Sequence, residues 1–488
     1  MKEFKIFFPF LIIGIFLIVN TSFYQTIILT IYTIFFILFL LKNLKSGTYF
    51  ILFALIPYSA FLWRLNFVFG DRIGTKNILL FFPDILFFIL IIYFILNIIV
   101  NKVNIHTTPI SKLLFIFIIY CAIQILNPST NLYSGISGFR FVLFLLMFYI
   151  GVFINLEYKD IIKLFNSIIA LSLILAGYAI IQNIFGLPFF EKKWLNEFWM
   201  TSNQLNFNNI YQQGSYFFGK TIRAYSFTEQ GPYLAQFLGF GISLSLVGYF
   251  YQKYKIKKLL YFAMIVFFFY AILITYSRGG IIVVSLTFLT ILLIRKSKIN
   301  FKIIIYIIAI LVIFNLVVSP YILKNITPSS AGEFGLLEIM NPSEAGSLVS
   351  RFFFWDFIVK NIILNPIGYG AGTAGTAAIG HSPILDVITD NQYLWITLQY
   401  GIIGLILYLL IIFKIFKTLL FAYNRTKITE NKNLVLSMLG CSIVYFSYGL
   451  VADNIEHRLP TYFYWFLLGV TFRFILCSER NREDIYRT

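Results

Sequence analysis

The sequence predicts an all-α protein that lies in a membrane and crosses it about fourteen times. Hydrophobic residues make up 59% of the 488 residues, whereas charged residues make up only 12%. The mean hydropathy is +0.85, which is far from that of a soluble globular domain. Apolar stretches of about 20 residues also recur along the chain, and each is long enough for one transmembrane helix.

The apolar stretches form three membrane parts separated by two long polar loops. Seven expected spans fill residues 1–186, four fill 231–319, and three fill 391–488, which ends in a cytoplasmic tail. The outer loops are 187–230 and 320–390. The first stretch lacks a small-residue cleavage site, so we interpret it as a retained helix and not as a signal peptide. The expected spans lie near 4–20, 23–41, 48–63, 78–100, 112–126, 136–154, 161–186, 231–250, 259–276, 279–294, 303–319, 391–413, 433–451 and 459–477.

Basic residues occur mainly in alternate breaks between the expected spans. The net charge of +18 alone is compatible with nucleic acid binding, but this distribution follows the positive-inside rule. It predicts that both termini lie in the cytoplasm and that the protein has no nucleic acid partner. The breaks assigned to the cytoplasm contain Lys42, Lys45, Lys102, Lys112, Lys159, Lys163, a basic run at 253–258 and another at 295–302.

The breaks assigned to the outer side are richer in arginine than the cytoplasmic ones. A planar guanidinium binds phosphate oxygens through two parallel hydrogen bonds, which the ammonium of lysine does not. We therefore expect the outer face to hold an anion. For Arg64, Arg140 and Arg458, the alternative is a side chain that only reaches lipid headgroups. The outer arginines are Arg64, Arg72, Arg140, Arg223, Arg278, Arg351 and Arg458.

Both long outer loops contain segments with functional side chains. Residues 220–237 read KTIRAYSFTEQGPYLAQF and place Arg223 and Glu229 just before the eighth span. The second loop contains SRFFFWDFIV, which predicts a short amphipathic helix that starts near Arg351. Its aromatic side chains are expected to lie on the membrane surface, and these are Phe352, Phe353, Trp355 and Phe357.

A glycine-rich stretch, from Gly368 to Gly380, follows this predicted helix. It does not fit a dinucleotide-binding fingerprint, since no strand-to-helix unit surrounds it. We expect a flexible or tightly turning loop. The loop leads through His381 to Asp390 and Asn391, at the outer mouth of the twelfth span.

Residues 273–284, LITYSRGGIIVV, place Arg278 alone between two apolar runs. An arginine at the centre of a membrane helix costs roughly 2.5–3.5 kcal/mol, and less near the interface, so it is retained chiefly where it has a partner. Gly279 and Gly280 leave the neighbouring backbone open to a bulky headgroup. The alternative is a plain turn in which the arginine reaches the lipid surface.

Three groups of motifs together resemble those of bacterial O-antigen ligases and O-antigen polymerases. They are R-x-x-S-F-T from Arg223, SRGG from Ser277, and NPIGYGAG followed by DNQYLWITLQYGIIG, and they cover about residues 220–404. The resemblance implies a multi-span, GT-C-like membrane glycosyltransferase that acts on glycans linked to undecaprenyl pyrophosphate and uses no metal or cofactor. It also implies an active site on the periplasmic side of the bacterial inner membrane.

Within this superfamily, position 390 favours a polymerase. Ligases typically have His-Asn where this chain has Asp390-Asn391, and His381 does not occupy that position. A polymerase transfers the growing glycan onto a sugar hydroxyl of a new lipid-linked repeat unit, and a chain-length regulator is an expected partner. The alternatives are a ligase, which transfers glycan to lipid A-core, and a flippase for lipid-linked oligosaccharide. The flippase is disfavoured because no internal repeat typical of transporters is evident.

Outer arginines are suited to the donor side of this reaction. Arg223 and Arg278 are predicted to bind the pyrophosphate and to stabilise the charge that develops on the leaving group. Arg351 is predicted to hold the second phosphate or to anchor the amphipathic helix. These three residues are the predicted pyrophosphate ligands.

The acceptor hydroxyl is a weak nucleophile and benefits from a base within hydrogen-bond reach. Asp390 is the first candidate, with Glu229 and His381 behind it. A helix cap beside Asn391 is the alternative role for Asp390, since aspartate is frequent at such positions.

Asp84 lies about two turns inside the fourth span, where an ionisable residue is a functional hypothesis by default. It is equally suited to a structural ion pair with Arg72 or Arg140. We treat these three residues as secondary candidates, together with Asn391.

Overall fold

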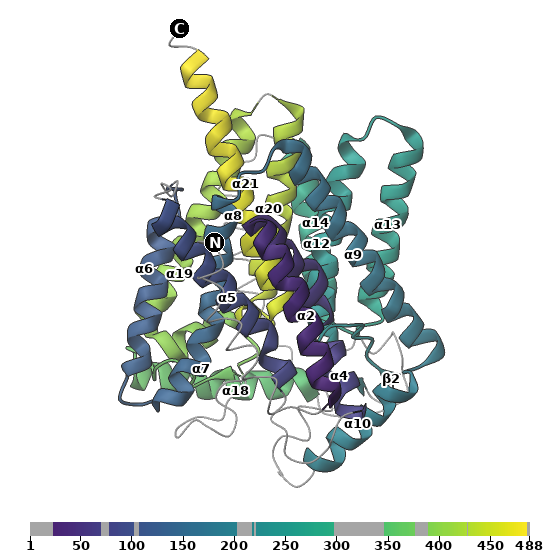
Figure 1. Cartoon of the computed structure of the whole chain (residues 1–488), viewed down its shortest axis with the longest axis vertical. Coiled ribbons are helices and arrows are strands. Elements are labelled where there is room, and N and C mark those ends of the chain that lie inside the picture. Colours follow the sequence, from purple (N-terminus) through teal and green to yellow (C-terminus); the bar gives the residue numbers. More distant parts are fainter. Residues whose placement is uncertain are drawn as a thin grey trace, which may run out of the picture.

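The computed structural model is almost entirely helical (Figure 1). Nine helices among its described residues are long and apolar enough to cross a membrane, which confirms the helical architecture and agrees with the prediction of a membrane protein. The expected spans at 4–20 and 303–319 lie outside the described residues, so the total of about fourteen stays a prediction. The structure describes residues 23–69, 78–101, 107–202, 217–218, 221–296, 346–375, 389–426 and 428–485.

Two of the expected N-terminal spans consist of several short helical pieces. Residues Leu44–Leu62 are continuous but pass from α-helix through a π turn and a 3₁₀ turn, a change that often marks strained or functional helix segments. Residues Leu132–Phe153 similarly contain a 3₁₀ turn. The elements are α2 (Phe23–Lys42), α3 (Leu44–Phe50), η1 (Ile51–Leu55), η2 (Ile56–Tyr58), α4 (Ser59–Phe69), α5 (Ile78–Asn101), α6 (Ser111–Ile123), η3 (Gln124–Leu126), α7 (Leu132–Leu143), η4 (Phe144–Leu146), α8 (Met147–Phe153) and α9 (Tyr158–Phe185).

The remaining elements begin with the first long outer loop. This loop contains a helix and a small antiparallel ladder in which Phe217 pairs with Ile222. The elements are α10 (Phe189–Ser202), β1 (Phe217–Phe218), β2 (Thr221–Ile222), α12 (Gly231–Tyr251), α13 (Lys255–Leu273), α14 (Arg278–Lys296), α18 (Gly346–Leu364), α19 (Gln392–Arg425), α20 (Thr429–Tyr448), η8 (Asn454–Glu456) and α21 (Arg458–Ile485). The boundaries between the three membrane parts and the two loops stay predictions.

Helices α12 and α21 lie at the centre of the molecule. In the apolar windows of these two helices, 78% and 83% of the residues are buried, against 17% in α13. Glycine allows α21 to approach α8 closely, because a Cβ on Gly469 would overlap the carbonyl oxygen of Phe148. Helix α13 therefore lies at the periphery, where its apolar side chains are suited to contact lipid.

The basic turns and the outer-loop helices lie at opposite ends of the molecule. Figure 1 shows the α12–α13 turn, the α19–α20 turn and the C-terminal part of α21 at one end, with α10 and α18 at the other. This is the arrangement that the positive-inside prediction requires. The direction of the chain across the membrane stays a prediction.

Helix α19 is longer than the expected span and is broken at Gly401, which has a φ of +67°. The break admits residues 366–372. Tyr369 N donates to Leu398 O at 2.9 Å, and Ile402 N donates to Pro366 O at 2.9 Å. The described part of the glycine-rich stretch, up to Gly375, turns tightly, as one of the two expectations had it, with positive φ at Gly368, Gly370, Gly372 and Gly375.

Helix α18 occupies the position of the predicted amphipathic helix and lies across the outer-loop end of the molecule (Figure 1). Its aromatic residues do not all lie on the membrane surface, and in this respect the prediction was wrong. Trp355 is buried, and its Nε1 donates to Thr389 O at 3.0 Å, whereas Phe357 is exposed. Trp355 thus ties the helix to the segment that precedes α19.

Candidate functional site

The segments that carry Arg223 and Arg278 lie side by side. Ala224 N donates to Ile274 O at 3.1 Å, just after α13 ends. A Cβ on Gly231, at the start of α12, would contact both Ala224 O and Thr275 O at 3.1 and 3.2 Å. The two arginines therefore come from adjoining strips of backbone, although 55 positions separate them in the chain.

Each of the three motif groups contains, or directly follows, one residue with strained backbone. Within the described ranges, the non-glycine residues with positive φ are Ser226 (+54°), Tyr276 (+52°) and Asp390 (+44°). Side chains other than glycine pay a steric cost there, and such residues concentrate at functional sites. The strain falls within three positions of Arg223 and Arg278, and on Asp390 itself.

A fourth segment, residues 449–458, connects the motifs to one another. Gln392 N donates to Gly449 O at 2.7 Å, and Asn391 Nδ2 donates to Leu450 O at 3.2 Å. Val451 lies against Gly279, where an added Cβ would come within 2.6 Å of it. This segment, which we call the connecting segment, holds the start of α19 beside the start of α14.

Asn391, and not Asp390, caps helix α19. The Asn391 Oδ1 accepts hydrogen bonds from Tyr393 N at 3.0 Å and Leu394 N at 3.1 Å, as an N-cap side chain does. The capping alternative for Asp390 was therefore wrong.

Asp453 of the connecting segment accepts a hydrogen bond from Asn391 N at 2.9 Å. Burial, together with the nearby charges of Glu456 and Asp390, raises the pKa of Asp453 well above its usual value.

Arg458 forms the most extensive ion-pair cluster of the site. Its Nε and Nη2 donate to the two oxygens of Asp84 at 2.7 and 2.8 Å, and its Nη1 donates to Glu229 Oε1 at 3.3 Å. Arg458 is only 6% exposed, so the alternative that it reaches lipid headgroups was wrong. Arg140 lies 4.0 Å from Asp84 and is a more distant partner. The ion pair expected for Asp84 exists, but chiefly with Arg458.

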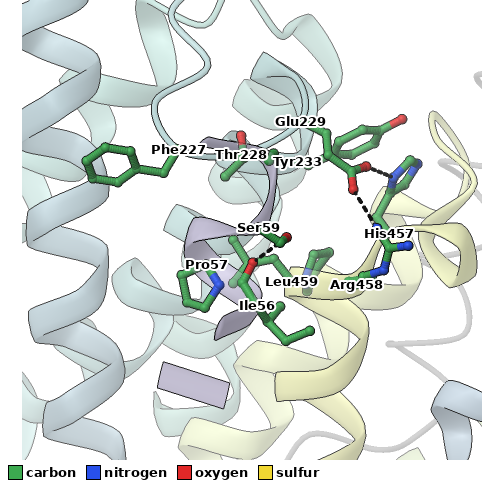
Figure 2. Close-up of a pocket in the computed structure, with 12 residues that line it drawn as sticks. Ile56, Pro57, Ser59, Phe227, Thr228, Glu229, Tyr233, His457, Arg458 and Leu459 are labelled. Atoms are coloured by element: carbon green, nitrogen blue, oxygen red, sulfur yellow. Dashed lines mark hydrogen bonds and ion pairs between the residues drawn. The ribbon is translucent and has the colours of Figure 1, made fainter. Parts of the chain in front are cut away.

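His457, which the sequence analysis did not select, lies beside Arg458. Its Nδ1 is 3.4 Å from Glu229 Oε2, and the Tyr233 ring stacks on it with centroids 3.2 Å apart. Figure 2 shows the Glu229 carboxylate between His457 and Arg458. The sequence does contain a signal for His457, because the short break ADNIEHRLP at residues 452–460 has an unusually high density of charged residues.

A small pocket opens beside this carboxylate (Figure 2). Glu229, Tyr233, His457 and Arg458 line one side of it. The other side is lined by four residues of η2 and the start of α4, which are Ile56, Pro57, Ser59 and Ala60. It holds about 20 Å³ of free volume, which is room for one water-sized group. The pocket can therefore receive a hydroxyl.

A second buried arginine holds the segment that carries Arg223 and Glu229. Arg64 Nη2 donates to Ser226 O at 2.9 Å and to Thr228 O at 3.2 Å, and its Nη1 lies 3.2 Å from Glu191. Arg64 is 1% exposed, so the lipid-headgroup alternative was wrong here too. Gln182 completes the arrangement, since its Oε1 accepts from Ser226 N at 2.7 Å.

Several predicted residues are not placed. Arg72 and His381 lie outside the described residues, and the Arg351 side chain does too, although its backbone belongs to α18. Arg223, Arg278, Glu229, Asp390, Asn391, Asp84 and Arg140 all belong to the described part of the chain.

Comparisons with known proteins point to the predicted superfamily. Residues 262–409 match the family model described as O-antigen ligase. A Rickettsia conorii protein named as a polysaccharide ligase is 31% identical over 191 residues, which are 37% of this chain and 41% of the relative. A Rickettsia typhi protein of the same name is 29% identical over 206 residues, 40% of this chain and 44% of the relative.

An O-antigen polymerase of Salmonella muenchen aligns over a longer stretch. It is 26% identical over 292 residues, which are 59% of this chain and 68% of the relative. By contrast, this chain spans only about two fifths of the length of the Rickettsia relatives. The resemblance predicted from the motifs is confirmed, and the matched segment includes Arg278 and the start of α19.

Proposed function

We propose that the protein is a surface-polysaccharide polymerase of the bacterial inner membrane, because residues 262–409 match the family model described as O-antigen ligase. It transfers a glycan chain from undecaprenyl pyrophosphate to a sugar hydroxyl of a new lipid-linked repeat unit. Both termini lie in the cytoplasm and the site faces the periplasm. A chain-length regulator is the expected protein partner.

The observation that carries this proposal is the joining of the two arginine segments by the Ala224–Ile274 hydrogen bond. Two guanidinium groups on adjoining backbone are suited to one diphosphate, whose oxygens accept parallel hydrogen bonds. In a partly dehydrated site, their attraction for the charge that develops on the departing phosphate exceeds its value in water. Arg223 and Arg278 thus stabilise the leaving group.

The acceptor side of the reaction is supported by the acids next to these arginines. The start of α19, which carries Asp390, is tied to the connecting segment, and this segment also contacts Glu229 through His457 and Arg458. Arginines and carboxylates on adjoining segments are suited to bind an anionic leaving group and a hydroxyl acceptor together. Transfer of a glycan between two lipid carriers needs this pair of functions.

Position 390 favours polymerisation over ligation, since this chain has aspartate where ligases typically have histidine. The Salmonella polymerase also aligns over a larger part of this chain than the Rickettsia relatives named above. Ligation of glycan to lipid A-core is the second candidate. It is favoured by the description of the family model and by the names of the Rickettsia relatives.

The test is deletion of the gene in its native host, followed by gel analysis of the surface glycan. A lost polymerase leaves single repeat units on lipid A-core. A lost ligase instead leaves a bare core and accumulated lipid-linked polymer, and a lost flippase leaves the lipid-linked unit on the cytoplasmic side.

Complementation of the deletion strain with variants then tests the arginines. Arg223→Gln and Arg278→Gln should each lower polymer formation by about 100-fold or more, the loss typical of removing one preorganised charge donor. Lys45→Met, at an exposed ion pair between α3 and α9, serves as the control. Full activity of both arginine variants would contradict the proposed roles.

A further inference from the structure

We propose that His457 is the general base that deprotonates the acceptor hydroxyl, and that Glu229 orients its imidazole. This inference rests on the function proposed above and names the catalytic group of the acceptor side. It differs from the expectation drawn from the sequence, in which Asp390, Glu229 and His381 were the candidate bases.

The hydrogen-bonding chemistry of Glu229 fixes which nitrogen of His457 is free. An ionised carboxylate only accepts hydrogen bonds, so the Nδ1 that lies 3.4 Å from Glu229 Oε2 carries the proton. The Nε2 then has the lone pair and can accept a proton from a substrate. A carboxylate that holds the tautomer of a histidine base is the arrangement used in catalytic triads.

Two further contacts hold this pair in place. Arg458 Nη1 donates to the other Glu229 oxygen at 3.3 Å, so the carboxylate is fixed from both sides. The ring of Tyr233, from the first turn of α12, stacks on the imidazole at an angle of 26°. The ring of His457 therefore has one face covered, and its plane is restrained.

Exposure is uneven within the cluster. Asp84, Arg458 and His457 have 4%, 7% and 7% of their side-chain surface exposed, whereas Glu229, which orients the base, has 35%. The pocket of about 20 Å³ reaches both Glu229 and His457. A sugar hydroxyl is about the size of a water molecule and fits this volume.

The charge state of the imidazole is suited to a base. Burial lowers the pKa of His457 below its ordinary value near 6.5, and this effect outweighs the opposing ones of Glu229 and Asp390; the charge of Arg458 lowers it further. Although burial alone would raise the pKa of Glu229, His457 and Arg458 lower it overall. At neutral pH the pair is thus a neutral imidazole and a carboxylate.

The reaction balances with these groups alone. The hydroxyl oxygen attacks the anomeric carbon of the donor glycan while its proton passes to His457 Nε2. The bond between the anomeric carbon and the phosphate oxygen breaks, and the electron pair leaves with undecaprenyl pyrophosphate, whose charge Arg223 and Arg278 stabilise. His457 then releases its proton to water.

The decisive variant is His457→Asn, because it separates the structural from the chemical role. The asparagine Nδ2 can take the place of the histidine Nδ1 and donate to Glu229, but nothing replaces Nε2. We expect polymer formation to fall by about 100- to 10,000-fold, the range for loss of a general base. His457→Ala removes both functions and should lose at least as much, with Lys45→Met as the control.

The assay uses purified protein and the lipid-linked repeat unit extracted from the deletion strain. The wild-type rate should fall as the pH drops through a midpoint below about 6.5, where the imidazole gains a proton. This fall in rate at low pH, the acid limb of the pH profile, should disappear in His457→Asn. Glu229→Gln should shift the midpoint further down, because it removes the negative charge that raises the pKa of His457.

Binding of undecaprenyl pyrophosphate without glycan distinguishes this inference from the proposed function. His457→Asn should bind this lipid as well as wild type does, whereas Arg223→Gln and Arg278→Gln should bind it at least about 10-fold more weakly. If wild type binds the lipid and polymerises but His457→Asn is equally active, the histidine inference is wrong and the proposed function stands. If wild type neither binds the lipid nor polymerises, both are wrong.

Discussion

Two buried arginines, Arg64 and Arg458, each form an ion pair and each contact the segment that carries Arg223 and Glu229. Arg64 donates to the backbone carbonyls of Ser226 and Thr228, and its acidic partner Glu191 is fully buried. Arg458 donates to the side chains of Asp84 and Glu229, and a third of the latter is exposed. The first network holds backbone in place, whereas the second presents a carboxylate and a histidine to a pocket.

The difference shows that a buried arginine gains its role from its partners. A carboxylate sealed inside the protein can only balance charge, whereas one that lines a pocket can also orient a reactive group. We expect four variants to test this difference, from the largest effect, the loss of Arg458, to the smallest, the loss of a surface ion pair that belongs to neither network.

The largest effect on stability is expected from Arg458→Met. Asp84, which is 3% exposed, would lose its bidentate partner and keep only the more distant Arg140, and breaking a buried ion pair costs about 3–5 kcal/mol. Unfolding of the purified protein in detergent measures this loss. The double variant Asp84→Asn/Arg458→Met should recover most of the stability but no activity, because Glu229 also loses its donor. If the double variant recovered activity, the Arg458 network would have only a structural role, like the Arg64 network, and the contrast between them would be wrong.

Arg64→Met should cost less, up to about 3 kcal/mol at neutral pH. Without Arg64, Glu191 can take up a proton and avoid the cost of a buried unpaired charge, because burial already raises its pKa above the ordinary value. A carboxyl whose folded pKa is raised destabilises the fold at high pH, and this penalty disappears as the pH falls through the folded pKa. The deficit of Arg64→Met should therefore shrink as the pH falls from neutral towards the ordinary range of a glutamate carboxyl.

The matched control for this second prediction is Arg64→Met/Glu191→Leu, which removes both charges. It should lie within about 1–2 kcal/mol of wild type at every pH, since apolar residues can replace a buried pair. A deficit that stayed constant with pH in the single variant would argue that Glu191 is not the source of the cost.

A smaller loss is expected for Gln182→Leu, which tests whether the Arg64 network acts by positioning. Its Oε1 accepts from Tyr225 N and Ser226 N, and leaving buried amides without an acceptor costs about 1–3 kcal/mol. Affinity for undecaprenyl pyrophosphate should weaken as Arg223 moves, with little change in the acid limb of the pH profile. Gln182→Glu keeps the acceptor but loses the Nε2 that donates to Glu191 at 2.8 Å, and because it sets two buried carboxylates side by side it should cost at least as much stability. An altered acid limb would mean that Gln182 also affects His457.

Lys45→Met should have the smallest effect. The Lys45–Asp160 pair is 2.8 Å apart, but both side chains are about one-third exposed. Exposed pairs contribute about 0–1 kcal/mol, and salt screens them. Thermal unfolding at low and high salt measures this value, and a loss comparable to that of Arg64→Met would contradict the distinction between buried and exposed pairs.

The sequence by itself determined the features that depend on local composition. Runs of about 20 apolar residues must be helical in lipid, since each backbone polar group has to be satisfied within its own segment. The positions of Arg223, Arg278 and the start of α19 followed from the same reading, because motifs at helix ends are local. Even there, the break of α19 at Gly401 was missed, since it depends on the insertion of residues 366–372 from another part of the chain.

Only the tertiary structure decided which helices are central and which charges meet. Every span is apolar, so composition does not separate buried α21 from peripheral α13, although 83% and 17% of their windows are buried. Asp84 and Arg458 are 374 positions apart, and His457 becomes a candidate base only where Glu229 and Tyr233 surround it. Such pairings depend on the packing of helices distant in sequence, for which a single sequence contains no local signal.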